Sequence, residues 1–188
     1  MNGLFYMLVN FAILGLLSLS TLSADDDYKI PPKAIADLVD APVTPSINLS
    51  PDKKHLLILE RTSLPSIAEL SQPELRLAGL RINPKTNGRS RTNNYKSIII
   101  KNIDSSKEKK VRGLPKSSHI SNVFWAPNGK HIAISVINGD RINLYLADVK
   151  NGKAKLLIKK PLNAIYGSAV YWLSDSEGLI VKTIIENR

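Results

Sequence analysis

The feature that most constrains the fold of this chain is a strand–turn–strand unit that occurs three times. In each unit a short apolar strand is followed by a tight turn rich in Pro, Asp, Asn, Ser or Gly, and then by a second apolar strand. Pro presets the first position of such a turn, and Asp, Asn and Gly accept the backbone conformations that follow. The turns lie at residues 50–53, 126–130 and 173–178. The pattern therefore predicts three antiparallel hairpins of one kind.

The middle unit continues into a complete four-stranded sheet. A third strand is expected because apolar and polar residues alternate along it, as they do in a half-buried strand. Its apolar residues are Ile142, Leu144 and Leu146, and a turn at 150–153 and a fourth strand at 154–159 follow. Trp125 and Trp172 hold equivalent places 47 residues apart, within the ~40–50-residue period of a β-propeller blade. The expected fold class is therefore all-β, as an incomplete β-propeller with about two and a half four-stranded antiparallel blades.

The expected propeller region covers residues 46–188. Its parts are a first blade at about 46–113 with an insertion at 62–94, a second blade at about 120–159 and a half blade at 169–185. Because a closed propeller needs at least ~4 blades, we expect the chain to be a fragment of a longer protein. A small β-sandwich is the competing fold. It explains the strands equally well, but it does not explain why the same turn returns after an aromatic-bearing strand.

The N-terminal residues read as a targeting signal. Residues 3–22 are almost wholly apolar and uncharged, and a stretch of small residues and then three aspartates follow. This order predicts an apolar helical signal peptide at 1–24, cleaved after Ser23 or Ala24, and an exported, periplasmic or secreted protein. No Lys or Arg precedes the apolar core. The alternative is an uncleaved membrane anchor at 3–22, since roughly 20 apolar residues can span a bilayer, and this is the only membrane contact that we expect.

Residues 25–45 are expected to form a lead-in that contains a short helix. Ile35, Leu38 and Val39 fall at helical spacing on one face. The prolines at 31 and 32 suit a first turn, where the missing N–H has no intrahelical partner.

The positive charge of the chain is concentrated in one segment. The formal net charge is +10, and the window from Arg76 to Lys116 holds twelve basic residues against two acidic ones. Such a segment is either a solvated loop or a surface that attracts an acidic partner. Nucleic acid is not expected as that partner, because the window has a single aromatic residue, Tyr95, and single-strand binders interleave basic with stacking residues.

No catalytic, cofactor-binding or metal-binding residue is predicted within the chain. Cysteine is absent, which excludes disulfides and thiolate sites. Ser168 and Ser176 each lack one glycine of the Gly-x-Ser-x-Gly nucleophile elbow. His55, His119 and His131 are too widely spaced for a recognisable metal motif. We therefore expect His55 and His131, which follow equivalent turns, to be structural.

Two segments resemble a known family. "YKIPPKAIADLVDAPVTPSINLSPD" at Tyr28–Asp52 and "ERTSLPSIAELSQPELRLAGLRINPKTNGRSR" at Glu60–Arg91 resemble the opening of glutamyl endopeptidase-type members of the prolyl oligopeptidase family. The second segment is the more specific, because it lies in the insertion. The resemblance implies an N-terminal propeller that gates access to a C-terminal α/β-hydrolase domain, with a Ser–Asp–His triad, no cofactor, and cleavage of peptides after Glu.

The first hypothesis is therefore a non-catalytic fragment of a secreted serine peptidase. Its partners would be peptide substrates and the missing C-terminal hydrolase domain, and none of the triad falls within the chain. Possible substrate-steering residues are Arg81, Arg89 and Arg91, whose charge would favour acidic peptides. The alternative hypothesis is an exported, non-enzymatic protein-binding module that recruits a partner through open strand edges.

Overall fold

The computed structural model describes residues 30–61, 63–116 and 119–185, and the chain divides into two units, Met1–Val39 and Asp40–Arg188. The expected signal peptide at 1–24 and the alternative anchor at 3–22 lie outside the described residues. Within those residues, no helix is both long enough and apolar enough to cross a membrane. The first described element is helix α2, Lys33–Asp40, over the segment whose spacing predicts a helix. The Pro32 carbonyl accepts its first hydrogen bond, from the Ile35 amide at 2.8 Å.

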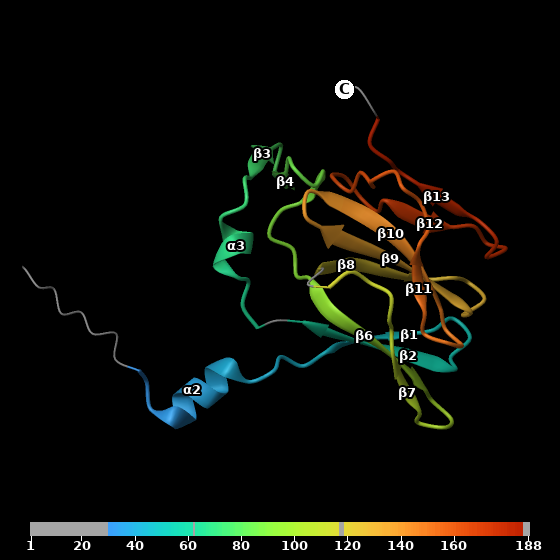
Figure 1. Ribbon diagram of the computed structural model, residues 1–188, viewed down its shortest axis with the longest axis horizontal. Helices are drawn as coiled ribbons and strands as arrows, with labels where there is room; N and C mark the ends of the chain where they lie inside the picture. The colour runs from blue at the N-terminus through green and yellow to red at the C-terminus, as the bar shows by residue number, and fades with distance from the viewer. Residues whose placement is uncertain (1–29, 62, 117–118, 186–188) are drawn as a thin grey trace, which may run out of the picture. The chain divides into compact units, whose positions relative to one another are not determined.

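The second unit is built on two four-stranded antiparallel meanders, in which each strand pairs with the next along the meander (Figure 1). The first meander consists of β1 (Ser46–Leu49), β2 (His55–Arg61), β6 (Tyr95–Asn102) and β7 (Glu108–Lys110). The second consists of β8 (His119–Trp125), β9 (His131–Asn138), β10 (Arg141–Asp148) and β11 (Ala154–Leu156). One residue pair, Tyr95 with Ile120, joins β6 to β8 and makes the two meanders one eight-stranded sheet. A separate hairpin, β12 (Val170–Trp172) and β13 (Leu179–Val181), follows.

The first turn of each meander and the turn of the β12–β13 hairpin have the same backbone hydrogen bonds. In the second turn the Ala126 amide donates to the His131 carbonyl at 2.9 Å, and the Gly129 amide donates to the Ala126 carbonyl at 2.9 Å. The same two bonds recur in the first and third turns. The residue in the left-handed region is Lys53, Gly129 or Ser176, with φ of 58°, 69° and 65°. The three turns predicted from Pro, Asp, Asn and Gly are therefore one structural repeat.

The side-chain register repeats as well. Ile47 pairs with Ile58, and the equivalent pairs are Val123 with Ile134 and Val170 with Val181. Ile58 pairs onward with Ile99 in the first meander, as Ile134 pairs with Tyr145 in the second. Successive side chains of a strand point to opposite faces of the sheet. The paired residues therefore form rows across the strands that lie on equivalent faces of the two meanders. The expectation of an antiparallel, mostly β fold is confirmed.

The second meander is buried on both faces, because its alternate residues enter two different cores. Ile132, Ile134 and Val136 of β9 pack with Leu57 and Ile98 of the first meander. The opposite face of the second meander packs against the β12–β13 hairpin in a second core. Its residues there include Ala133, Ile142 and Leu144. Trp172 ties this hairpin to β8, since its Nε1–H donates to the Phe124 carbonyl at 3.1 Å. The second meander therefore packs face to face on the first, and the β12–β13 hairpin packs on the second.

The segment at 62–94, expected as an insertion, has secondary structure of its own. It contains helix α3 (Ile67–Leu70) and strands β3 (Leu75–Leu77), β4 (Leu80–Asn83) and β5 (Gly88–Arg89), which form a small antiparallel sheet. The insertion leaves the first meander after β2 and returns at β6, so that it stands at one end of the sheet (Figure 1).

Candidate functional site

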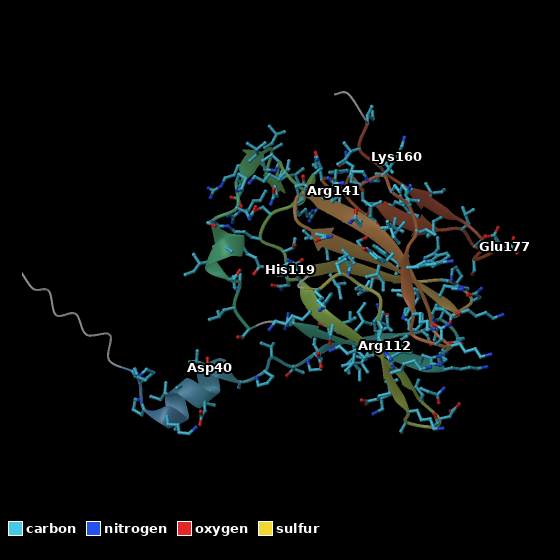
Figure 2. All side chains as sticks on the ribbon, viewed as in Figure 1. Asp40, Arg112, His119, Arg141, Lys160 and Glu177 are labelled. Carbon is cyan, nitrogen blue, oxygen red and sulfur yellow. The ribbon has the colours of Figure 1, made fainter. Side chains whose placement is uncertain are left out.

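A cleft of about 360 Å³ lies between the insertion and the end of the sheet. One wall comes from α3 and from residues 89–94, and the other comes from Arg61, His119 and the turn between β9 and β10. Figure 2 labels His119 at the end of the sheet that faces α3. The cleft therefore joins segments that are far apart in the sequence.

Arg61 reaches the cleft because the strand pairing shifts at that point. Glu60 pairs with Ser97 but Arg61 pairs with Tyr95, which leaves Lys96 as an extra residue on β6. Such a bulge bends a strand and redirects its side chains. The Nε atom of Arg61 is buried and has no hydrogen-bond partner among the described residues.

Helix α3 fixes the position of Glu69 and, through it, of His119. Ser66 and Glu69 form a capping box, in which the Ser66 amide donates to Glu69 Oε2 at 2.9 Å and the Glu69 amide donates to Ser66 Oγ at 3.2 Å. The other carboxylate oxygen lies 3.5 Å from His119 Nδ1. Burial raises the pKa of Glu69, but the Ser66 hydrogen bonds and the charge of His119 outweigh it, so the pKa lies below its ordinary value. Glu69 is therefore an ionised group whose partners are already in place.

The structure separates the three arginines that the sequence grouped as substrate-steering residues. Arg89 and Arg91 line the cleft, whereas Arg81 does not. Arg81 instead pairs with Glu74 at 2.9 Å, and the same carboxylate pairs with Arg76 at 3.1 Å and with Arg91 at 3.5 Å. No ion pair between described residues involves Arg89. The basic charge of the insertion is therefore partly neutralised, and Arg89 is the member of the three that keeps its charge uncompensated.

The sequence pattern missed two residues that decide this arrangement. Glu74 stands two positions before the basic window that begins at Arg76, so the window appears less balanced than the folded insertion is. Arg61 ends an apolar strand and lies outside the same window. The sequence does carry a local signal for Glu74, because this acid lies two residues before Arg76. No local signal marks Arg61, because the bulge that redirects it depends on pairing with β6.

The ionic composition of the cleft favours an anion. Among the described residues, its wall holds three guanidinium groups, Arg61, Arg89 and Arg91, against the single carboxylate of Glu69. Hydroxyl and amide side chains fill much of the remaining wall; they include Ser63, Thr86, Ser90, Thr92 and Asn93. Arginine is the side chain best suited to bind planar oxyanions, because its fork of N–H donors matches their geometry.

The two serines that come near the nucleophile-elbow pattern form hydrogen bonds with backbone groups. The hydrogen bonds of Ser168 Oγ go to the backbone of Val170, and Ser176 Oγ accepts from the Asn128 amide at 3.0 Å. His55 and His131 pair across the strands with Asn102 and Asp148, at equivalent positions of the two meanders. No group of three His, Cys, Asp or Glu residues within the described ranges could hold a metal ion.

Comparison with known proteins finds two plant relatives that carry the same name. No protein-family model matches the chain. A rice protein (Oryza sativa subsp. japonica) named "Probable glutamyl endopeptidase, chloroplastic" is 41% identical over 175 residues, covering 86% of this chain and 18% of its own length. A protein of the same name from Arabidopsis thaliana is 37% identical, covering 93% of this chain and 20% of its own length.

Among solved structures, one from Bacteroides ovatus, titled a "putative dipeptidyl aminopeptidase IV", has a TM-score of 0.45 and 16% identity over 73% of this chain and 20% of its own. The chain spans about a fifth of the length of the curated relatives that it matches. Over most of its own length the chain is therefore a relative of part of the plant proteins named as glutamyl endopeptidases.

Proposed function

We propose that the chain is the non-catalytic propeller part of a secreted serine peptidase of the prolyl oligopeptidase family. The observation that carries the proposal is the similarity to proteins named as glutamyl endopeptidases, at 37% and 41% identity over most of this chain. In this proposal the propeller restricts which peptides reach a hydrolase domain elsewhere in the longer protein, and that domain cleaves after Glu.

The internal repeat supports a propeller over a β-sandwich. The strand pair Val123 with Ile134 recurs 47 residues on as Val170 with Val181, within the ~40–50-residue period of a propeller blade. The second meander is buried on both faces, as a blade is between two neighbours. A sheet in a two-layer sandwich packs one face on the core and leaves the other to solvent.

The export part of the proposal depends on residues 1–24 and has its own test. N-terminal mass spectrometry of the protein purified from its native cells should find a mature chain that begins at Ala24 or Asp25. A mature chain that still begins at Met1 would contradict cleavage and favour the anchor at 3–22.

The peptidase part of the proposal is tested with a fluorophosphonate probe, which reacts with activated serine nucleophiles. We expect no labelling of the 188-residue chain, because Ser168 and Ser176, the serines that come nearest to the nucleophile elbow, form hydrogen bonds with backbone groups. We expect labelling of the polypeptide that the gene encodes when it is read beyond Arg188. Labelling of the short chain, or a downstream sequence without Gly-x-Ser-x-Gly, would contradict the proposal and favour an independent protein-binding module.

A further inference from the structure

We propose that the cleft between the insertion and the sheet binds a carboxylate group, with Arg61 and Arg89 as the two cations that hold it. The ligand is the acidic side chain of a peptide, and this choice of source rests on the proposed peptidase function. The site is a binding site in the propeller part and takes no part in bond cleavage.

The charges of the cleft leave two cations for a ligand. Glu69 is occupied by Ser66 and His119, and Arg91 lies 3.5 Å from the carboxylate of Glu74. Arg61 and Arg89 make no ion pair with described residues. In a cleft of about 360 Å³, close to the lower end of the volumes found for small-ligand sites, two such guanidiniums attract an oxyanion.

Arg61 is the more unusual of the two cations. Its Nε–H is shielded from solvent and donates to no described group, although buried donors in proteins almost always have a partner. A carboxylate in the cleft would accept that hydrogen bond. The bulge at Arg61 is matched by a second one on β8, where Ile120 and Asn122 pair with consecutive residues of β9 and Ser121 is extra. Two bulges therefore lie at the same end of the sheet, beside the cleft.

The opposite wall presents Arg89 and Arg91 from one short segment. Arg89 is the last residue of β5, with an exposed side chain. Arg91 has φ of 55°, in the left-handed region that a residue with a Cβ rarely adopts. This backbone turns the segment so that both arginines line the cleft. A peptide side chain that enters between the two walls meets Arg61 on one side and Arg89 on the other.

The test is a direct binding titration with the 188-residue chain. Calorimetry measures the dissociation constants of the peptide acetyl-Ala-Glu-Ala-amide, of its Gln counterpart, of glutarate and of inorganic phosphate. The variants are Arg61→Gln and Arg89→Gln, and the matched control is Arg112→Gln, which removes the same charge from an exposed residue outside the cleft. Thermal melting shows whether each variant is folded. If Arg61→Gln fails to fold, the exposed Arg89 still provides the test.

We expect the Glu peptide to bind, the Gln peptide to bind at least about tenfold more weakly, and each cleft variant to weaken the Glu peptide at least about tenfold. Arg112→Gln should leave the affinity within about twofold. Equal binding of both peptides, or equal loss in Arg89→Gln and Arg112→Gln, would overturn the site. Phosphate or glutarate binding more tightly than the Glu peptide, with the same dependence on Arg89, would overturn the peptide as the ligand. The titration needs no turnover, so its failure leaves the fluorophosphonate result on the proposed function unaffected.

Discussion

At the scale of single residues, one carboxylate organises the basic insertion. Arg76 and Arg81 lie directly opposite each other on β3 and β4, where two like charges destabilise a strand pair. Glu74 accepts hydrogen bonds from both, at 3.1 and 2.9 Å. The Arg81 guanidinium, more than any other group, lowers the pKa of Glu74 from its ordinary value of 4.5 to about 2. The hairpin therefore depends on Glu74 remaining ionised.

The pH dependence of the hairpin follows from that shift. Because the folded pKa of Glu74 is below the unfolded one, its stabilisation is fully present above about pH 4.5 and is lost as the pH falls toward about 2. We expect hydrogen-exchange protection factors of β3 and β4 amides to fall over this range. Glu74→Gln should lower them at pH 7 and remove this pH step. Glu74→Gln with Arg76→Gln should recover part of the loss, since the repulsion is gone. Protection in Glu74→Gln equal to wild type would contradict this account.

At the scale of elements, the repeated turns also form contacts between sheets. Asp52 of the first turn is fixed by Ser50 Oγ at 2.6 Å and by the Lys54 amide at 3.2 Å. A Cβ placed on Gly129 of the second turn would lie 2.7 Å from Asp52 Cγ. The third turn contacts the second, because the Asn128 amide donates to Ser176 Oγ. Gly129 therefore has two structural roles. Its backbone adopts the left-handed conformation, and its missing side chain leaves room for Asp52 of the first turn.

The two roles of Gly129 can be separated with a matched glycine. Gly139 has φ of 62° but no atom within 4 Å of an added Cβ. We expect Gly139→Ala to lower the free energy of unfolding by about 1–2 kcal/mol through backbone strain alone. Gly129→Ala should cost about 1–3 kcal/mol more, because the methyl group displaces Asp52. Urea denaturation measures both. The excess should disappear when Asp52→Ala is added, and equal losses in the two single variants would show that the contact contributes nothing.

The elements that the sequence predicts well are those whose signal is local. The turns, the alternating strands and the helix at Lys33–Asp40 follow from Pro, Gly, Asp and hydrophobic spacing over a few residues. The cleft could not be predicted in the same way, because Arg61, Glu69 and His119 meet only after the insertion folds against the sheet end. The interpretation of Arg81 as a steering residue remains a prediction, although its guanidinium is engaged by Glu74.

At the scale of the second unit, the repeat shows one face that lacks its neighbour among the described residues. The row Ile47–Ile58–Ile99 is equivalent to the row Val123–Ile134–Tyr145, which packs against the first meander. Ile134 is fully buried, whereas its equivalent Ile58 is only half-buried and Ile47, at the edge of the row, is 66% exposed. In the proposed propeller, a further blade covers the first row in the same manner as the first meander covers the second row.

This face should make the 188-residue chain associate with itself. Sedimentation velocity over a range of concentrations should show association of the wild-type chain, and Ile47→Glu should reduce it by placing a charge in the apolar row. Leu77→Glu is the matched control, because Leu77 in the insertion is equally exposed, at 66%. A wild-type chain that stays monomeric and melts cooperatively would contradict an uncovered blade face, as would equal effects of the two substitutions.

Under the proposed function, this chain is part of a longer peptidase that cleaves after Glu. The most direct test is the ratio of kcat/KM values for two fluorogenic peptides, identical except for Glu or Gln before the scissile bond. The enzyme is the polypeptide encoded when the gene is read beyond Arg188. We expect roughly a hundredfold or greater preference for Glu, abolished by Ser→Ala substitution in its Gly-x-Ser-x-Gly motif. Equal cleavage of both peptides, or no cleavage by a folded protein that the fluorophosphonate probe labels, would contradict the claim.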